Sequence, residues 1–170
     1  GYRYVVQTLQ DRGASDVLFD MNSRYDVPGY GYQIAMGETA LAESWQSRDY
    51  LSHNHCMLGH LYSWLFSGIG GISQESGSTA YKRIVIDPQI VGDLRDARVS
   101  FRSPYGLIRS EWKDAPDEFV QTIEIPANAT ARICLPATDP AKVTESGKPV
   151  SGRKDMAVES GTDGRIELHV

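Results

Sequence analysis

The spacing of apolar residues divides the chain into two parts. From Tyr2 to Ile72, apolar residues recur every three or four positions, which is typical of amphipathic helices. After Gly70-Gly71 and the polar run 73–79, the repeat changes to alternate positions, which is typical of half-buried strands. The sequence therefore predicts an α+β chain, with helices over residues 1–72 and strands over residues 73–170.

The first part begins with two predicted helices. Apolar residues lie at i, i+3, i+4 and i+7 in the first: Tyr2, Val5, Val6 and Leu9. Arg12-Gly13 marks the end of this helix, and Ser15 can cap a second one. Segment 25–31 contains Pro and Gly and predicts a loop.

Two further helices are expected before residue 72. Thr39 is a plausible N-cap for a short helix over Ala40–Gln46, and Ser52 or Asn54 for a longer one. The longer helix carries its apolar residues at helical spacing: Met57, Leu58, Leu61, Trp64, Leu65 and Ile69. The first part is therefore predicted to be a series of helical hairpins.

The second part reads as an antiparallel β-sandwich. Runs of alternating apolar residues are separated by turn residues every ~8–12 positions, the spacing expected of such a fold. Pro104-Tyr105-Gly106 and Asp163-Gly164 predict hairpin turns. Trp112 and Tyr105 are expected to fill the sandwich core or to stabilise a hairpin.

Composition narrows the kind of partner. The net charge is −5 and no Lys/Arg cluster is present, so the chain has no electrostatic footprint for nucleic acid or anionic lipid. No run approaches the ~20 apolar residues of a membrane span. Cys56 and Cys134 each lie in an apolar run, which predicts two buried thiols rather than a disulfide framework. A small or neutral partner is therefore expected.

The start of the chain suggests that more helices precede it. The sequence opens with Gly-Tyr-Arg-Tyr, without Met and without the basic and apolar regions of a signal peptide. A few helical hairpins expose faces that need a partner layer. We therefore expect an upstream part of the same polypeptide. Periplasmic or extracellular placement would require a signal peptide there.

Candidate chemistry gathers in residues 37–60. Glu43, Trp45 and His55 combine a carboxylate, an aromatic ring and an imidazole, groups that together commonly hold a sugar. A carboxylate of this kind can also act as a general base on water. Plainer interpretations remain: Glu43 as an exposed helix residue, and His53 and His55 as cap or core residues. His53 and His55 could also be metal ligands, with Glu43 or His60 completing the set.

Ordered segments extend this picture along the chain. The first part contains GETALAESW (37–45), SHNHCMLG (52–59), WLF (64–66) and GIGGI (68–72). The second contains YKRIVIDPQ (81–89), SPYG (103–106), SEW (110–112), IPANATA (125–131) and ESG (145–147). In this order and spacing they resemble, over nearly the whole chain, the C-terminal part of family 78 glycoside hydrolases, the bacterial α-L-rhamnosidases.

The resemblance implies a fold and a chemistry. It implies the last helical hairpins of an (α/α)6 barrel followed by a C-terminal β-sandwich, in an enzyme that inverts configuration without a cofactor. On the matched segments, Glu43 takes the place of the general base, His55 that of a histidine reaching sugar hydroxyls, and Trp45 lines the pocket. The general acid would lie in the upstream barrel. Ala42 departs from the pattern, since members often carry an aromatic residue there.

Three readings of function follow. The first is part of an α-L-rhamnosidase acting on a rhamnose-containing glycan or glycoside, with the isolated chain expected to be inactive. The second is another six-hairpin glycosidase, such as an α-L-fucosidase or a glucuronyl hydrolase. The third is a non-catalytic carbohydrate-binding module that depends on Trp112 or Tyr105.

Overall fold

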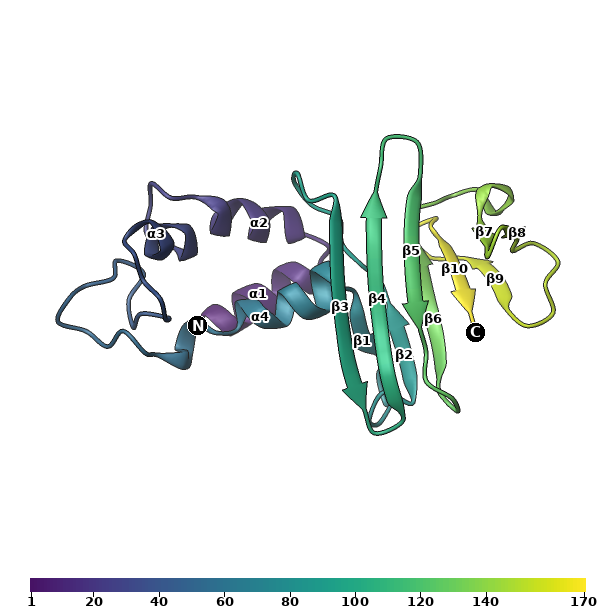
Figure 1. Ribbon diagram of the computed structural model, residues 1–170, viewed down its shortest axis with the longest axis horizontal. Helices are drawn as coiled ribbons and strands as arrows, with labels where there is room; N and C mark the ends of the chain where they lie inside the picture. The colour runs from purple at the N-terminus through teal and green to yellow at the C-terminus, as the bar shows by residue number, and fades with distance from the viewer. The chain divides into compact units, whose positions relative to one another are not determined.

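The computed structural model describes residues 1–170 and separates them into two compact units (Figure 1). The first unit contains residues 1–68 and 89–94, and the second contains residues 69–88 and 95–170. Helices occupy the first unit and sheets the second, so the predicted order of helices followed by strands is confirmed.

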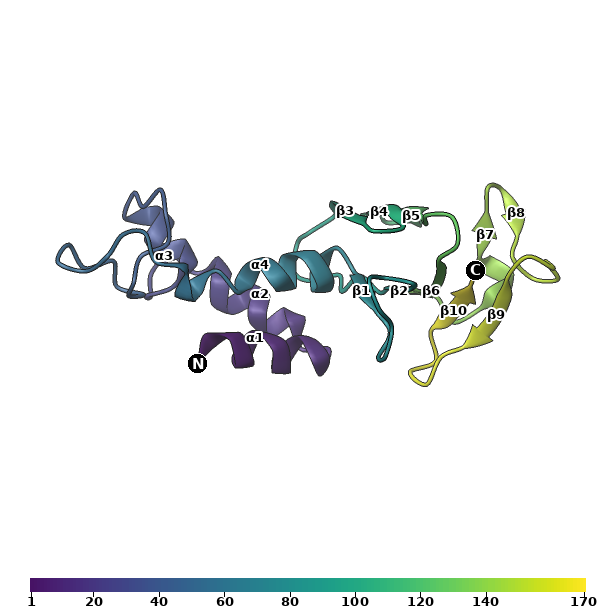
Figure 2. The ribbon, with the colours of Figure 1, turned by 90° about the horizontal axis from the view of Figure 1, so that it is seen from below.

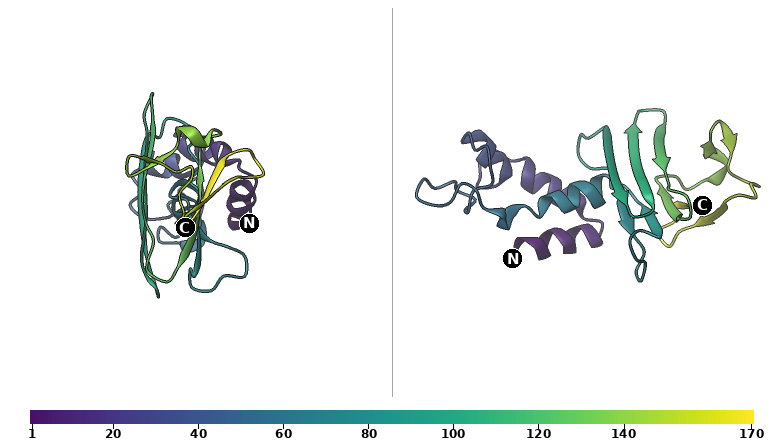
Figure 3. Two further views of the ribbon diagram at one scale, coloured as in Figure 1. Left: turned by 90° about the vertical axis from the view of Figure 1, so that its right-hand side faces the viewer. Right: turned by 60° about the horizontal axis from the view of Figure 1, so that its bottom comes forward.

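Short helices build the first unit. They are α1 (Tyr2–Asp11), α2 (Ser15–Ser23), α3 (Tyr30–Ala35), the 3-10 turn η1 (Cys56–Leu58), α4 (Leu61–Trp64) and the π-helical turn η2 (Leu65–Ile69). Helix α1 packs beside α2 and α4 (Figure 3, right). None of these helices has the length and apolar character needed to cross a lipid bilayer. The first two predicted helices are confirmed.

Two other helix predictions need correction. Residues Ala40–Gln46 form no helix, and the backbone N–H groups of Ala42 and Glu43 bind acceptors outside the segment. The longer helix exists only in pieces, as η1, α4 and η2. The predicted loop over 25–31 ends where α3 begins, at Tyr30. The sequence thus predicted one helix that is absent, over residues 40–46, and missed α3.

A buried hydrogen bond joins α4 to α2 in the first unit. Trp64 is 3% exposed, and its Nε1–H donates to Oγ of the buried Ser15 at 2.7 Å. Ser15 Oγ in turn donates to Oε1 of Gln89. Val6 and Leu18 are buried in the same unit. Trp64 is therefore a packing residue of the first unit.

Ten strands form three sheets in the second unit. They are β1 (Ile72–Gln74), β2 (Arg83–Ile86), β3 (Asp96–Ser103), β4 (Gly106–Asp114), β5 (Phe119–Glu124), β6 (Thr130–Leu135), β7 (Thr144–Glu145), β8 (Lys148–Pro149), β9 (Ala157–Ser160) and β10 (Ile166–His169), with a 3-10 turn η3 (Pro140–Lys142) before β7. The five-stranded sheet has the order β1-β2-β6-β10-β9, the three-stranded sheet is β3-β4-β5, and β7 pairs with β8. Figure 2 shows the two larger sheets as layers.

Pairing within these sheets is antiparallel with one exception. Strands β2 and β6 run parallel, which the prediction of a wholly antiparallel sandwich missed. Both predicted hairpins are present: Ser103 pairs with Gly106 across the turn of Pro104 and Tyr105, and β9 returns as β10 past Gly164.

The core of the second unit lies between the two larger sheets. Isoleucine side chains fill much of it: Ile84 and Ile86 on β2, Ile108 on β4, Ile133 on β6 and Ile166 on β10. Trp112 is 2% exposed, and its Nε1–H donates to the backbone oxygen of Ile69 at 2.8 Å. Trp112 therefore fills the sandwich core, whereas Tyr105 at the hairpin turn is 42% exposed.

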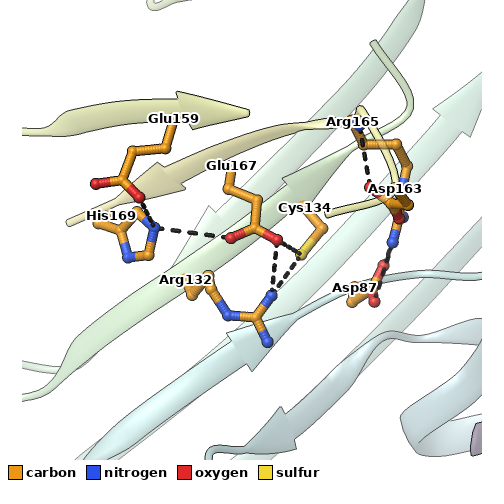
Figure 4. A network of polar contacts seen from close by, with 8 residues as sticks. All are labelled: Asp87, Arg132, Cys134, Glu159, Asp163, Arg165, Glu167 and His169. Carbon is orange, nitrogen blue, oxygen red and sulfur yellow. Dashed lines mark hydrogen bonds and ion pairs between the residues drawn. The ribbon is translucent and has the colours of Figure 1, made fainter. Parts of the chain in front are cut away.

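The alternate positions of β6 and β10 carry a network of charged side chains (Figure 4). Arg132 Nη1 donates to Glu167 Oε1 at 3.1 Å, and His169 Nε2 lies 3.8 Å from that glutamate's other oxygen. Beside them, Arg165 holds Asp87 at 2.7 Å. These side chains are half-buried, and ion pairs that remain open to solvent usually add little to stability.

The two cysteines differ in environment. Cys134, next to Arg132 on β6, is buried, and burial raises the pKa of its thiol to about 11. Cys56 is exposed. The prediction of a buried thiol is therefore confirmed for Cys134 and wrong for Cys56, because the apolar run around Cys56 forms only a single 3-10 turn.

Gly71 gives a direct test of packing before β1. Its φ of +75° lies in the left-handed region, and an added Cβ would meet Pro88 N and lie 2.7 Å from Asp87 C. Gly71→Ala should therefore lower the free energy of unfolding by at least about 2 kcal/mol. Gly152 is the control, because it has φ +80° with nothing within 4 Å. Gly152→Ala should cost only about 1 kcal/mol in urea denaturation; equal losses would contradict the close approach.

Candidate functional site

Glu43 lies on a stretch without regular secondary structure that runs beside residues 52–55. Its backbone N–H donates to Ser52 O at 2.8 Å, and His55 N–H donates to Leu41 O at 2.7 Å. Two segments that are about ten residues apart in sequence are thereby held side by side. Glu43 and His55 therefore lie on neighbouring stretches, although not on the two helices that the sequence predicted.

The Glu43 side chain is fixed by Ser52, which also pairs with the Glu43 backbone. Ser52 N–H donates to Glu43 Oε2 at 3.2 Å, so Glu43 and Ser52 exchange hydrogen bonds in both directions. Glu43 is half-buried, which excludes the alternative of an exposed helix residue. A carboxylate held at one oxygen keeps its other oxygen, Oε1, for a further hydrogen bond.

Trp45 belongs to a cluster of three aromatic rings. Its ring lies 5.0 Å from that of Tyr2 and 5.1 Å from that of Tyr30, in both cases edge to face. Tyr30 Oη–H donates to Leu58 O, and Tyr2 Oη–H donates to Asn22 Oδ1 at 3.1 Å. Burial raises the pKa of both tyrosines. The cluster thus holds Trp45 against α1 and α3.

Gln33 on α3 contacts the backbone on both sides of Glu43. Its side chain is 2% exposed; Oε1 accepts from Ala42 N–H at 3.3 Å, and Nε2 donates to Ser44 O at 3.4 Å. Sequence reasoning missed Gln33. A glutamine in a short helix carries no signal of its own, and the contact joins residues that no periodic pattern connects.

Glu38 and His53 form a second link across this region. His53 Nδ1 lies 2.8 Å from Glu38 Oε2, and His53 Nε2 lies 3.3 Å from Arg48 O. The hydrogen bond to Glu38 raises the pKa of His53. His53 is exposed, so of its two plainer interpretations, a cap residue or a core residue, the structure rules out only the core one.

A metal site is not assembled here. No group of three or more His, Cys, Asp or Glu side chains in the structure lies close enough to hold an ion. His53 is paired with Glu38, and His55 starts the turn η1. What this part of the chain does assemble is a half-buried carboxylate at Glu43, His55 on the neighbouring stretch, and Trp45 in an aromatic cluster.

Models of protein families match residues in both units. Residues 1–69 match the model described as the bacterial alpha-L-rhamnosidase 6 hairpin glycosidase domain. Residues 71–149 match that of the bacterial alpha-L-rhamnosidase C-terminal domain. The fold and these matches place the chain among the six-hairpin glycosidases, at the junction between the helical domain and the domain that follows it.

Individual relatives of this chain are also named alpha-L-rhamnosidases. The chain is 30% identical over 148 residues to an alpha-L-rhamnosidase of Streptomyces avermitilis and 26% identical over 153 residues to one of Formosa agariphila. These alignments cover 82% and 87% of the chain but only 14% and 16% of the two relatives. The chain belongs to the bacterial α-L-rhamnosidase family.

Solved structures show the same fold. The crystal structure of Streptomyces avermitilis alpha-L-rhamnosidase complexed with L-rhamnose superposes with a TM-score of 0.78 at 27% identity, covering 97% of this chain and 16% of that one. The alpha-L-rhamnosidase of Dictyoglumus thermophilum gives a TM-score of 0.81 at 25% identity, covering 99% of this chain and 19% of that one. The fold class expected from the sequence is therefore confirmed.

The Glu38–His53 pair predicts a pH response. The pKa of His53 is higher in the folded state than in the unfolded state. The pair therefore stabilises the fold fully below the unfolded pKa of about 6.5, and this stabilisation is lost as pH rises through the folded pKa. Glu38→Gln should lower the pKa of His53, measured by NMR titration of its imidazole resonances. Glu75→Gln, which instead breaks an exposed pair with Arg83, should leave it unchanged. An unaltered His53 titration in Glu38→Gln would contradict the pair.

Proposed function

We propose that this chain is the C-terminal part of an inverting glycoside hydrolase that removes terminal α-L-rhamnose from glycosides or polysaccharides. Glu43 is the general base that activates water. The general acid lies in the upstream barrel of the same polypeptide, so the isolated chain has no turnover. The family membership and the L-rhamnose in the solved structure of a relative support the substrate class.

The geometry of Glu43 carries this proposal. An inverting mechanism needs a carboxylate that takes a proton from water on one face of the sugar, while a carboxylic acid protonates the leaving oxygen on the other. Glu43 is half-buried, and Ser52 N–H fixes its Oε2, which leaves Oε1 to orient a water. Positioning of this kind is the first requirement of a general base.

His55 and Trp45 are the proposed sugar contacts. His55 lies on the stretch that pairs with Leu41, beside the stretch of the base. Trp45 follows Glu43 by two residues and is held by the rings of Tyr2 and Tyr30. An aromatic ring covers the apolar face of a pyranose, and an imidazole can hydrogen-bond its hydroxyls.

The burial of Trp112 weighs against a carbohydrate-binding module. Its side chain is 2% exposed, and its Nε1–H donates a hydrogen bond to Ile69 O. The indole ring is therefore not accessible to a glycan. Tyr105 alone would have to carry that function. Another six-hairpin glycosidase activity would keep Glu43 and change the sugar.

Hydrolysis of p-nitrophenyl glycosides by the full-length polypeptide tests the proposal. We expect release from the α-L-rhamnoside, and we expect Glu43→Gln to lower kcat/KM by about 10²–10⁴-fold, the usual contribution of a general base. Binding of rhamnose should survive, because the amide keeps the size and hydrogen-bonding reach of the carboxylate. Activity should be absent from the isolated chain.

The control is Glu118→Gln, which changes an exposed glutamate between β4 and β5. It should retain wild-type activity. Activity on a different sugar that still depends on Glu43 would replace the substrate. The enzyme assignment would be overturned if Glu43→Gln kept wild-type activity. It would also be overturned if the polypeptide bound a sugar without any turnover and Tyr105→Ala abolished that binding.

A further inference from the structure

The stretch that carries Glu43 has no regular secondary structure to hold it. Residues 40–46 are neither helix nor strand, so a carboxylate placed there depends on individual contacts. Catalysis is sensitive to such placement, because a shift of about 1 Å can cost on the order of 10²-fold in rate. The contacts that fix this backbone therefore matter for the proposed reaction.

One buried side chain makes two of these contacts. The Gln33 amide accepts from Ala42 N–H at 3.3 Å and donates to Ser44 O at 3.4 Å, so it spans the residue between them. That residue is Glu43. Because Gln33 is 2% exposed, little water is present to replace these bonds if the amide is removed.

Gln33 is itself held firmly on α3. Its N–H donates to Gly29 O at 3.0 Å, and its carbonyl accepts from Glu38 N–H at 3.0 Å. Within the same helix, an added Cβ at Gly31 would meet Arg24 O and lie 2.8 Å from Arg24 C, so α3 packs directly on that backbone. The backbone from which the Gln33 side chain extends is therefore held on both sides.

We infer that Gln33 is the positioning residue of the proposed general base: its amide clamps the backbone on both sides of Glu43 and so sets where the carboxylate lies. The inference rests on the proposed function of Glu43. Gln33 touches neither the sugar nor the water; it acts through the backbone of residues 42 and 44.

The test compares Gln33→Met with Ser15→Ala in the full-length polypeptide. Methionine keeps the length of the side chain and removes both hydrogen bonds. Ser15→Ala also removes buried hydrogen bonds in the same unit, to Trp64 and Gln89, without touching the Glu43 stretch. We expect Gln33→Met to lower kcat about 10–100-fold with little change in KM, and Ser15→Ala to keep kcat near wild type.

Gln33→Asn is a second variant, which keeps the inference testable if Gln33→Met fails to fold. It keeps a buried amide but draws it back by about 1.5 Å, so both contacts cannot be kept. A loss in kcat at unchanged KM is expected here as well. The inference is overturned if either folded Gln33 variant keeps wild-type kcat, or if Ser15→Ala loses kcat as much as they do at a similar melting temperature. Glu43→Gln, run in parallel, separates this outcome from failure of the proposed function, in which Glu43 itself would prove dispensable.

Discussion

The site depends on where the backbone N–H groups of residues 42, 43 and 55 find acceptors. Buried polar groups of the main chain need partners, and outside a helix those partners must come from elsewhere. Here they come from the Gln33 side chain, Ser52 O and Leu41 O. Those three bonds turn a stretch without regular structure into a fixed one. The carboxylate of Glu43 is fixed in turn, because it accepts a hydrogen bond from Ser52 N–H.

The same bonds explain where sequence reasoning succeeded and where it failed. Apolar periodicity predicted α1, α2 and the strands, although Val5 on α1 and Val17 and Met21 on α2 are exposed. Residues 40–46 are mostly good helix formers, yet contacts from distant residues outweigh that weak preference. The resemblance directed attention to Glu43, Trp45 and His55. It could not reveal Gln33 or the Glu38–His53 pair, since both contacts exist only in the folded chain.

The second unit shows a clear division between packing and surface. Trp112 fills the interior and donates its indole N–H to Ile69 O, while charged side chains occupy alternate positions of β6 and β10. An imidazole lies beside carboxylates here too, because His169 Nε2 is 3.8 Å from both Glu159 and Glu167. The family match covers both units, and the proposed chemistry belongs to the helical one.

The proposal that Glu43 serves an inverting glycosidase can be tested most directly through the stereochemistry of the product. The full-length polypeptide would be given an α-L-rhamnoside, and proton NMR would follow the anomeric signal of the sugar released before mutarotation. Inversion requires the β-anomer to form first, because water activated by the base attacks the face opposite the leaving group. Initial release of the α-anomer would instead indicate a covalent intermediate and would contradict the role of Glu43 as a base.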